Sequence, residues 1–482
     1  MKLNELLRDI PLKEMTAQGD LEIRDIQYDS RKVQPGDLFV AVQGMQSDGH
    51  KFIPMAVQKG AAAVLCMQKP GEDVPYILVD DSRLALALTA AAYYGYPSRE
   101  LVMIGVTGTN GKTTSTTLIK HVIEKCLGKK CGLIGTIANM IGDEVVPTER
   151  TTPESYELQH LLRRMVDAGC EYAVMEVSSH ALELDRVAGI RFRVGSFTNL
   201  TQDHLDFHGT MENYAAAKAK LFSICDKAAV NMDDKWSAYM CKAAACPVLP
   251  YGIGPAEEGL RAEHVKFAPS GVEFDAVMNG ERVPVSLAIP GRFSVSNALT
   301  VISAAYLLGI SVSDCAEALK TETGVKGRVE VVPGTKDYTI VIDYAHTPDA
   351  LEKVLQTMRG VAVGRVVALF GCGGDRDPIK RPIMAKAAAD NADFTVITSD
   401  NPRTENPNRI IEDIVPGMPE GADYIVIPDR REAIAWAMDN HRTNDIIVLA
   451  GKGHETYQEI NGVKHHMDER EIVAEHLRDM GV

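Results

Sequence analysis

The chain has 482 residues, of which 45% are hydrophobic and 24% are charged, a composition typical of folded globular proteins that excludes a disordered or collagen-like chain. At roughly 150 residues per domain the length predicts about three domains, and no stretch approaches the roughly 18 apolar residues that a membrane-spanning helix needs. The formal net charge of -15 argues against nucleic acid as a partner, because a phosphate backbone demands a basic face.

The N-terminal segment, residues 1–10, is charged and amphipathic and has no hydrophobic signal core, which predicts a cytoplasmic location. The nine cysteines are scattered without a C-x-x-C pair. We therefore expect reduced thiols, and neither a disulfide framework nor a structural zinc site.

A small α/β domain is expected over residues 1–98. Pro35-Gly36 marks a turn, and the apolar run from Leu38 to Val42 is typical of a buried strand. Ser30 and Arg31 precede this turn. From chemistry alone they predict a turn cap beside a solvated arginine, with a ligand contact as the alternative. A boundary near 96–98 then leads into a second domain, expected over residues 99–328.

A glycine-rich loop follows the apolar run 101–104 and precedes a helical pattern from about Ser115 to Lys125. From position 105 it has the sequence Gly-Val-Thr-Gly-Thr-Asn-Gly-Lys-Thr-Thr. This order of strand, turn and helix brings backbone N–H groups to phosphate oxygens, with Lys112 as a point charge and the Thr113 hydroxyl as a magnesium ligand. The loop departs from the Walker A spacing, since Val106 stands where that fingerprint has glycine. We predict a nucleotide site; a turn that only connects strand to helix is the alternative.

Two apolar strands of this domain end in polar side chains. The first begins at Tyr172 and delivers Glu176, and the second lies near Phe197 and leads to His204. Ligands of doubly wound sheets lie beyond the carboxyl ends of the strands, where the Lys112 loop also opens. Both side chains are therefore metal-ligand candidates. The alternatives are a helix-capping carboxylate and a structural histidine.

Three further segments of the central domain are polar or helical. Thr151 and Thr152 precede a helix and are either N-caps or ligand contacts. Lys218 lies in a predicted helix, Met211 to Ser223, and by composition alone is a solvated helix lysine. The span 226–285 predicts short strands that complete the domain, and an alanine-rich helix then starts near Asn297.

The third domain, expected over residues 329–482, alternates strand and helix patterns and implies a doubly wound sheet. Asp343 ends its first strand, where it accepts from a ribose or holds His346. No dinucleotide fingerprint is present, which argues against an NAD-type cofactor. Polar clusters at 371–377, 400–403 and 451–455 are expected at one edge of the sheet. The apolar strands are predicted at 340–342, 366–370, 394–398, 424–427 and 446–449.

The loop variant Thr-Gly-Thr-Asn-Gly-Lys-Thr at 107–113 resembles the one in the Mur ligase family, which includes the folylpolyglutamate synthetases. Matches continue in order along essentially the whole chain: Asp-Ser-Arg at 29–31, Ala-Lys-x-x-Leu-Phe at 217–222, Gly-Arg-Val-Glu at 327–330 and Asp-Asn-Pro-Arg at 400–403. The resemblance implies an α/β fold of three domains. These are a small N-terminal UDP-binding domain, a central ATP-binding domain with a P-loop-type parallel sheet, and a C-terminal Rossmann-like, doubly wound domain that binds an amino acid.

The motifs point to the family members that add meso-diaminopimelate to the D-glutamate of UDP-N-acetylmuramoyl-L-alanyl-D-glutamate, in peptidoglycan and cell wall biosynthesis. The resemblance implies ATP-dependent amide formation through an acyl phosphate, with ATP and Mg²⁺ as cofactors. It also implies a monomer whose partners are these two substrates.

The resemblance assigns roles to individual residues. Lys112, Glu176, His204 and Lys218 are expected to be catalytic. ATP is expected to contact Gly108, Thr109, Asn110, Gly111, Lys112, Thr113, Thr114, Asn297, Arg328 and Asp343. The UDP-muramoyl-dipeptide is expected to contact Ser30, Thr151, Thr152, Ser178, Arg186 and Lys218. Diaminopimelate is expected to contact Arg376, Asp400, Asn401, Pro402, Arg403, Gly451 and Glu455. One magnesium ion is expected at Thr113, and a second at Glu176, His204 and Lys218.

Two of these positions carry a special expectation. In the family the lysine matching Lys218 is carbamylated to N6-carboxylysine, which turns an ammonium into the kind of oxygen ligand that magnesium prefers. Ser294 stands where the family usually has asparagine, so the resemblance assigns no role to it.

Arg403 is expected to determine which amino acid the enzyme selects. Its guanidinium can bind the extra carboxylate of diaminopimelate bidentately, and L-lysine would leave a buried arginine unpaired at a cost of about 1–3 kcal/mol. A surface arginine after a turn proline is the alternative for this residue.

Other functions of this fold stay open as alternatives. Ligation of L-lysine is one, and a folylpolyglutamate synthetase is another, although the motifs at 29–31 and 400–403 argue against the latter. An ATP-hydrolysing switch would need no amide-forming acceptor. A silent scaffold is disfavoured because the expected phosphate and metal residues are present.

Overall fold

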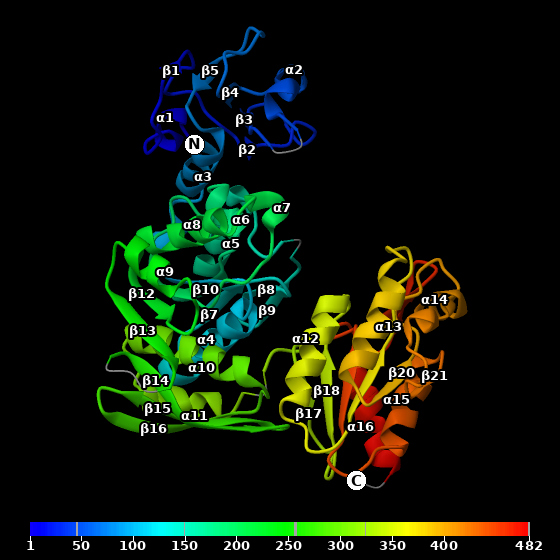
Figure 1. The fold of residues 1–482 in the computed structure, drawn as a ribbon. Helices are drawn as coiled ribbons and strands as arrows, with labels where there is room; N and C mark the ends of the chain where they lie inside the picture. Colours follow the sequence, from blue (N-terminus) through cyan, green and yellow to red (C-terminus); the bar gives the residue numbers. More distant parts are fainter. Residues whose placement is uncertain (45–46, 149, 255–257, 323, 481–482) are drawn as a thin grey trace. The chain divides into compact units, whose positions relative to one another are not determined.

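The computed structural model describes residues 1–44, 47–148, 150–254, 258–322 and 324–480 (Figure 1). The chain forms two compact α/β units: Met1–Gly252 with Thr300–Ser311, and Ile253–Leu299 with Val312–Val482. Within the described residues, no helix combines the length and the apolarity needed to cross a membrane.

The first unit begins with a five-stranded sheet in the order β1-β5-β4-β3-β2, which is parallel except for the β1–β5 pair. Successive strand residues face opposite sides, so Leu38 and Val40 pack on one hydrophobic cluster while Phe39 packs on the other. The predicted strand from Leu38 ends at Val40, two residues early. The elements are α1 (Leu3–Leu6), β1 (Glu14–Met15), β2 (Ile26–Gln27), β3 (Leu38–Val40), η1 (Gly49–Phe52), α2 (Ile53–Gln58), β4 (Ala63–Cys66), β5 (Tyr76–Leu78), α3 (Ser82–Tyr93) and η2 (Pro97–Arg99).

The larger sheet of this unit carries the strands β13-β12-β11-β6-β10-β7-β8-β9 in that order. The pairs from β13 to β7 are parallel, and β8 and β9 add an antiparallel edge. Parallel strands covered on both faces are continuously apolar, as in β10, which is buried from Ala173 to Glu176.

The elements of this part of the chain alternate between strands and helices. They are β6 (Val102–Thr107), α4 (Lys112–Leu127), β7 (Cys131–Ile134), β8 (Asn139–Ile141), β9 (Glu144–Val146), α5 (Ser155–Asp167), β10 (Tyr172–Glu176), α6 (Ser179–Glu183), β11 (Phe192–Phe197), α7 (Leu205–His208), α8 (Met211–Ala219), η3 (Lys220–Ser223), β12 (Cys225–Asn231), α9 (Ser237–Ala243) and β13 (Val248–Ile253).

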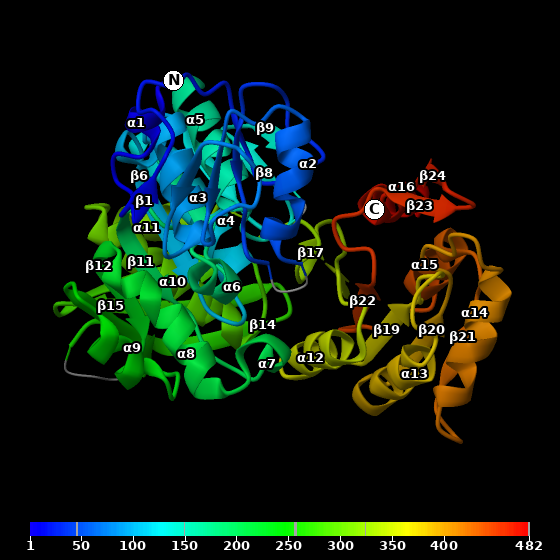
Figure 2. The same ribbon diagram turned by 90° about the horizontal axis from the view of Figure 1, so that it is seen from above.

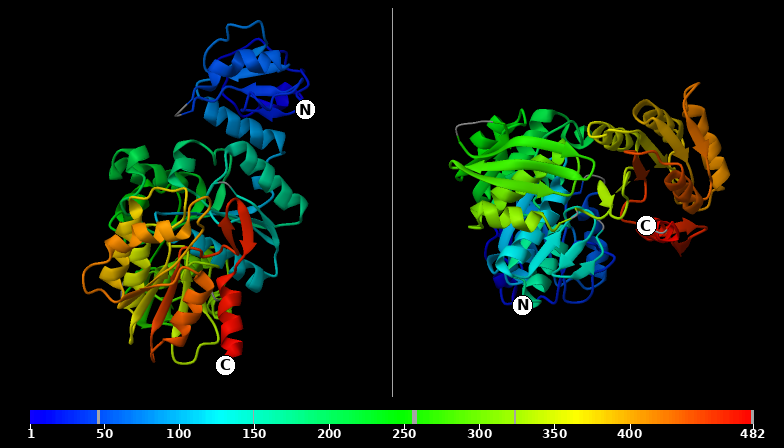
Figure 3. Two further views of the ribbon diagram at one scale, coloured as in Figure 1. Left: turned by 90° about the vertical axis from the view of Figure 1, so that its right-hand side faces the viewer. Right: turned by 90° about the horizontal axis from the view of Figure 1, so that it is seen from below.

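An antiparallel meander opens the second unit: β14 (Leu260–Ala268), β15 (Gly271–Met278) and β16 (Glu281–Leu287) (Figure 3). The sequence predicted short strands here, whereas β14 has nine residues and β15 has eight. Asn279 and Gly280 have φ of 51° and 82°, the conformation of a two-residue hairpin turn that keeps long strands in register. The helices α10 (Arg292–Leu307) and α11 (Val312–Leu319) follow, and α11 contacts β16.

The second unit ends in a six-stranded sheet with the order β17-β18-β22-β19-β20-β21, parallel except for the β17–β18 pair. α12, α13 and α14 cover one face, and α15 and α16 cover the other (Figure 2). The sheet is therefore doubly wound, as predicted, and its five parallel strands lie within two residues of the predicted bounds, whereas β17 was not predicted. The elements are β17 (Glu330–Val332), β18 (Thr339–Asp343), α12 (Pro348–Arg359), β19 (Val366–Phe370), α13 (Lys380–Asn391), β20 (Phe394–Ile397), α14 (Pro407–Ile414), η4 (Val415–Gly417), β21 (Tyr424–Val426), α15 (Arg430–Asp439), β22 (Ile446–Ala450), β23 (Tyr457–Ile460), β24 (Val463–His466) and α16 (Glu469–Asp479).

Candidate active site

The glycine-rich loop joins β6 to α4, and two of its glycines have backbone angles that favour glycine. Gly108 has φ +154° and Gly111 has φ +84°. A Cβ atom on Gly108 would overlap the Thr198 hydroxyl. α4 begins at Lys112, three residues before the predicted start, because Gly111 serves as its N-cap. The N-terminal N–H groups and the positive dipole end of α4 therefore lie directly after the loop, where they favour an anion.

The segment after β11 holds the loop in place. Thr109 N donates to the Asn199 carbonyl at 2.9 Å, and Asn110 N donates to Asn199 Oδ1 at 3.0 Å. The Thr198 hydroxyl donates to the Asn110 carbonyl at 2.7 Å, and Thr201 N donates to Thr109 Oγ1 at 3.1 Å. Sequence reasoning used this segment only for His204. These bonds show that it also fixes the conformation of the predicted phosphate loop.

Two lysines contact the loop, Lys112 from its own C-terminal end and Lys218 from α8. Lys112 Nζ donates to the carbonyls of Gly108 and Thr109, both at 2.9 Å, and Lys218 Nζ donates to the Gly108 carbonyl at 2.8 Å. Lys218 is 1% exposed, so its interpretation as a solvated helix lysine is wrong. Burial, and then the charge of Lys112, lower the pKa of Lys218 well below its ordinary value. The Lys218 nitrogen also lies 4.5 Å from the centre of the Tyr214 ring.

Glu176 lies at the carboxyl end of β10, 1% exposed, and both of its oxygens are bound by Thr136. Thr136 N donates to Oε1 at 2.9 Å, and the Thr136 hydroxyl donates to Oε2 at 3.0 Å. A Cβ atom on Gly135 would lie 2.6 Å from Oε1, so glycine is needed for this approach. The following helix is capped by Ser178, whose hydroxyl accepts from Ala181 N, and not by Glu176. Sequence reasoning missed Thr136, although it follows β7 at the same sheet edge.

The threonine pair 151–152 joins the same network. Thr151 Oγ1 and Thr136 Oγ1 are 3.0 Å apart, and the Thr152 hydroxyl donates to the Glu176 carbonyl at 2.8 Å. Ser178 N donates to Thr152 Oγ1 at 3.1 Å. The N-cap of the next helix is Glu154, so neither threonine is an N-cap.

Arg186 contacts this network from α6's C-terminal side. Its Nη1 donates to the Thr152 carbonyl at 3.2 Å, and its Nη2 pairs with Glu154 at 2.7 Å. Burial lowers the pKa of Arg186 from its ordinary value. The predicted residues Thr151, Thr152, Ser178 and Arg186 thus form one connected group with Glu176.

His204 differs from these residues because its side chain is 48% exposed. It has φ 51°, its Nε2 lies 3.5 Å from Asp203 Oδ2, and its ring meets that of His180 edge-on with centroids 4.8 Å apart. Across the described part of the chain, no three His, Cys, Asp or Glu side chains are grouped as metal ligands. The predicted set contains only two such side chains, Glu176 and His204, so the magnesium site stays a prediction.

Ser30 and Asn297, which were predicted to contact the substrate and ATP, are buried, as is Ser294. The Ser30 hydroxyl donates to Met55 Sδ at 3.4 Å in the N-terminal sheet region. Asn297 is buried in α10. Ser294, at the position where an asparagine is usual, donates to the Pro290 carbonyl at 2.9 Å and so closes the first turn of α10.

Asp343 and Arg328 lie together in the second unit. The two Asp343 oxygens accept from Val329 N and Ala345 N, both at 2.8 Å, and burial raises the pKa of this carboxyl. The His346 ring nitrogen Nδ1 instead contacts the Tyr344 carbonyl at 2.8 Å, so Asp343 does not hold His346. The Arg328 guanidinium lies 5.5 Å from the centre of the Tyr344 ring.

The three polar clusters of the C-terminal sheet follow β19, β20 and β22 and meet at its carboxyl edge. Arg403 Nη1 donates to the Gly374 carbonyl at 2.8 Å, and Asn401 Nδ2 donates to Glu455 Oε2 at 2.8 Å. Arg403 has φ 52° and its side chain is partly buried, with Nε 3.5 Å from Glu459 Oε2. Arg403 is therefore not a simple surface arginine, but the expectation of a buried arginine that L-lysine would leave unpaired is also wrong, because its side chain is 24% exposed and already lies against Glu459.

Asp400 forms the floor of this edge. Its Oδ1 accepts from Asn401 N at 2.6 Å, and its buried Oδ2 makes no hydrogen bond to the described residues. A Cβ atom on Gly451, which has φ +116°, would lie 2.6 Å from Oδ2. Arg430 Nη1 lies 3.9 Å from the same oxygen and is paired with Glu469. Arg376 is exposed in the loop after β19.

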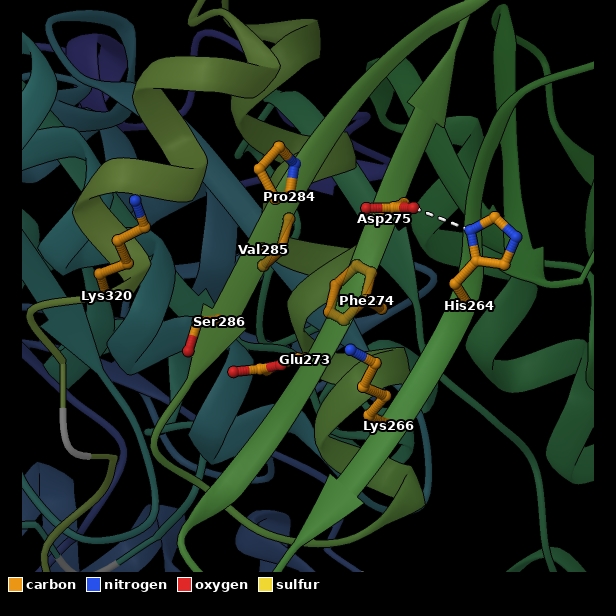
Figure 4. Close-up of a pocket in the computed structure, with 9 residues that line it drawn as sticks. All are labelled: His264, Lys266, Glu273, Phe274, Asp275, Pro284, Val285, Ser286 and Lys320. Atoms are coloured by element: carbon orange, nitrogen blue, oxygen red, sulfur yellow. Dashed lines mark hydrogen bonds and ion pairs between the residues drawn. The ribbon is translucent and has the colours of Figure 1, made fainter.

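A separate cavity of about 310 Å³ lies on the meander and beside Lys320 (Figure 4). Two of its polar side chains are paired: Asp275 accepts from His264 at 2.8 Å, and it also accepts from Arg282 at 2.9 Å. No residue predicted for the site lines this cavity.

Family models match the chain in three successive segments. They are described as Mur ligase family catalytic domain over residues 22–94, Mur ligase middle domain over 106–305, and Mur ligase glutamate ligase domain over 327–453. The chain therefore belongs to the Mur ligase family, and its fold is the three-domain α/β fold of that family.

Several relatives of the chain carry the name of one particular ligase of this family. Proteins named UDP-N-acetylmuramoyl-L-alanyl-D-glutamate–2,6-diaminopimelate ligase are 46% identical in Clostridium botulinum and 42% identical in Bacillus licheniformis, each aligned over 100% of both chains. A solved structure with this name has a TM-score of 0.77 at 34% identity and covers 100% of this chain and 99% of the other. A MurF ligase from Thermotoga maritima in complex with ADP shares the fold, with a TM-score of 0.56 at 19% identity over 96% and 99% of the two chains.

Proposed function

We propose that this chain is an ATP-dependent ligase that adds meso-diaminopimelate to the D-glutamate of UDP-N-acetylmuramoyl-L-alanyl-D-glutamate in peptidoglycan synthesis. The full-length identity of 42–46% to relatives that carry this name is the observation that supports it most directly. The proposed domains are residues 1–98 for UDP, 99–328 for ATP and 329–482 for the amino acid. The proposed enzyme is a cytoplasmic monomer.

The first step transfers the γ-phosphoryl group of ATP to the glutamate side-chain carboxylate, which releases ADP and leaves an acyl phosphate. The loop 108–114 receives the phosphates, and Lys112 and the α4 N-terminus neutralise their charge. Such transfers depend chiefly on positioning and charge stabilisation. Asn297, Arg328 and Asp343 are proposed to contact the rest of the nucleotide.

Magnesium fits the oxygen-rich donor set proposed for it. Thr113 would hold one ion, and Glu176, His204 and carbamylated Lys218 would hold a second; both would supply charge neutralisation at the phosphates. The hydrogen bonds from Thr136 support this assignment, because they hold the buried Glu176 carboxylate in one orientation and leave each oxygen a second lone pair.

Carbamylation of Lys218 is supported by its surroundings. The lowered pKa favours a neutral amine, whose lone pair can add to CO₂ with loss of one proton. The product is an anion, and the positive charge of neighbouring Lys112 then stabilises it where it destabilised the ammonium. The charge of Lys112, which makes an ammonium unfavourable, therefore favours the carbamate.

In the second step the diaminopimelate amine attacks the acyl phosphate carbon, and phosphate leaves from a tetrahedral intermediate. Arg403 is proposed to bind the far carboxylate and Glu455 the distal ammonium. Arg376, Asp400, Asn401, Pro402 and Gly451 complete this proposed site. The UDP-muramoyl-dipeptide is proposed to contact Ser30, Thr151, Thr152, Ser178, Arg186 and Lys218.

The test measures ATP-dependent phosphate release with the UDP-muramoyl-dipeptide and Mg²⁺, with meso-diaminopimelate in one reaction and L-lysine in another. We expect release with diaminopimelate and a product heavier by one such residue in mass spectrometry. Release with lysine instead would overturn the role of Arg403. Release without either amino acid would identify an ATPase, and silence in both reactions would refute the proposal.

A further inference from the structure

Lys452 follows β22 and is fully buried, with 0% of its side chain exposed. Its Nζ donates to Asn401 Oδ1 at 3.0 Å and lies 3.3 Å from Glu455 Oε2. The Tyr457 ring centre is 5.7 Å away. A buried ammonium is tolerated only when it is paired and hydrogen-bonded, and Asn401, Glu455 and the Tyr457 ring provide these contacts for Lys452.

The contact with Lys452 sets the direction of the Asn401 side-chain amide. Asn401 Oδ1 accepts from Lys452 Nζ and also from Glu459 N at 2.9 Å. A flipped amide would turn its NH₂ group toward two donors and lose both bonds. Nδ2 must therefore point the other way, where it donates to Glu455 Oε2 at 2.8 Å.

Glu455 is consequently held by one oxygen. Oε2 takes the Asn401 and Lys452 contacts, while Oε1 accepts no hydrogen bond from the residues that the structure describes. The side chain is 15% exposed, so a ligand can reach it. One carboxylate oxygen, fixed in direction by the contacts with Asn401 and Lys452, is thus available to a cationic group.

We propose that Lys452 is a positioning residue for amino-acid selection. It acts through Asn401 and Glu455, and it fixes the carboxylate that receives the distal ammonium of diaminopimelate. This inference rests on the proposed function. Lys452 itself touches the two side chains and not the substrate.

The first experiment compares Lys452→Met with Lys452→Gln and the wild type. Methionine removes one of the two donors to Asn401 Oδ1 and the contact with Glu455 Oε2, so both side chains are oriented less firmly and the KM for diaminopimelate should rise about tenfold. The KM values for ATP and the UDP-muramoyl-dipeptide should not change. Glutamine keeps an NH₂ donor and should recover part of the loss. If the role of Lys452 were purely structural, the melting temperature and kcat would fall, and the KM for diaminopimelate would not rise more than the KM values for the other two substrates.

The second experiment measures selectivity with 2-aminopimelate, which keeps both carboxylates and lacks the distal ammonium. The wild type should prefer diaminopimelate in kcat/KM, and Lys452→Met should reduce that preference about tenfold. Unchanged KM and selectivity in Lys452→Met would overturn the inference. Failure of the wild type to ligate diaminopimelate would instead overturn the proposed function.

A variant that leaves Lys452 in place keeps the inference testable if the buried methionine prevents folding. Asn401→Asp retains the acceptor for Lys452 but has no donor for Glu455. It should show the same loss of selectivity against 2-aminopimelate. Wild-type selectivity in folded Asn401→Asp would also overturn the inference.

Discussion

Thr136→Val removes the hydroxyl that donates to Glu176 Oε2 at 3.0 Å and leaves the backbone N–H that donates to Oε1 at 2.9 Å. The side chain keeps its volume and loses one hydrogen bond to a charged acceptor. Such a bond contributes about 1.5–3 kcal/mol. If this energy orients Glu176 for phosphoryl transfer, kcat/KM for ATP should fall about 10- to 100-fold.

The assay is phosphate release at saturating dipeptide and amino acid, with ATP and Mg²⁺ varied in turn. The half-saturating Mg²⁺ concentration should rise with the loss of kcat/KM. Thr136→Ser is the matched control, because it keeps the hydroxyl and should remain close to wild type. Thr151→Val is a second control, because it removes the hydroxyl of Thr151 that contacts Thr136 Oγ1 and leaves the bond from Thr136 to Glu176 in place. A Thr136→Val enzyme with wild-type kcat/KM and Mg²⁺ dependence would refute the assigned orientation of Glu176.

Four further outcomes are expected. Lys112→Ala should reduce kcat by about 100- to 1000-fold while circular dichroism shows an intact fold; substantial turnover would remove Lys112 from phosphoryl transfer. Lys218→Ala should be nearly inactive in phosphate release, with partial recovery by a short carboxylic acid, and full activity without it would exclude a carbamate. Gly108→Ala should cost about 1–3 kcal/mol in a denaturant titration, since its Cβ overlaps the Thr198 hydroxyl, and unchanged stability would contradict the loop geometry. Burial lowers the pKa of His208 from 6.5 to about 4, so the unfolded chain binds the proton more tightly than the folded chain. The free energy of unfolding should therefore fall as the pH drops from 6.5 to about 4. In His208→Gln the melting temperature should depend less steeply on pH over this range, and a slope identical to that of the wild type would refute this linkage.

The fold was predictable wherever the pattern was local. Strands such as Val366–Phe370 are continuous apolar runs because helices cover both faces of a parallel sheet, and their bounds follow directly from the sequence. The start of α4 was placed three residues late, because Gly111 and the polar residues after it lack the apolar period that marks a helix.

The site residues were only partly predictable. Glu176 ends a buried strand, so its place at the sheet edge could be expected from the chain order. Thr136 could not be assigned to it, because the two residues are 40 positions apart and a lone threonine has no motif. Lys218 lies in an alanine-rich helix and Lys452 in a glycine-containing loop, and their burial depends on side chains from distant elements.

The hydroxyl chain at Thr136 also has a direction. A hydroxyl carries a single proton, and that of Thr136 is given to Glu176 Oε2, so Thr136 must accept from Thr151 across their 3.0 Å contact. The proton of Thr151 is then committed inward, and Thr151 presents only lone pairs outward. A substrate group that contacts Thr151 in this arrangement has to be a hydrogen-bond donor, such as a peptide N–H. A carboxylate could bind there only if Thr151 rotated its hydroxyl proton away from Thr136 and toward the substrate.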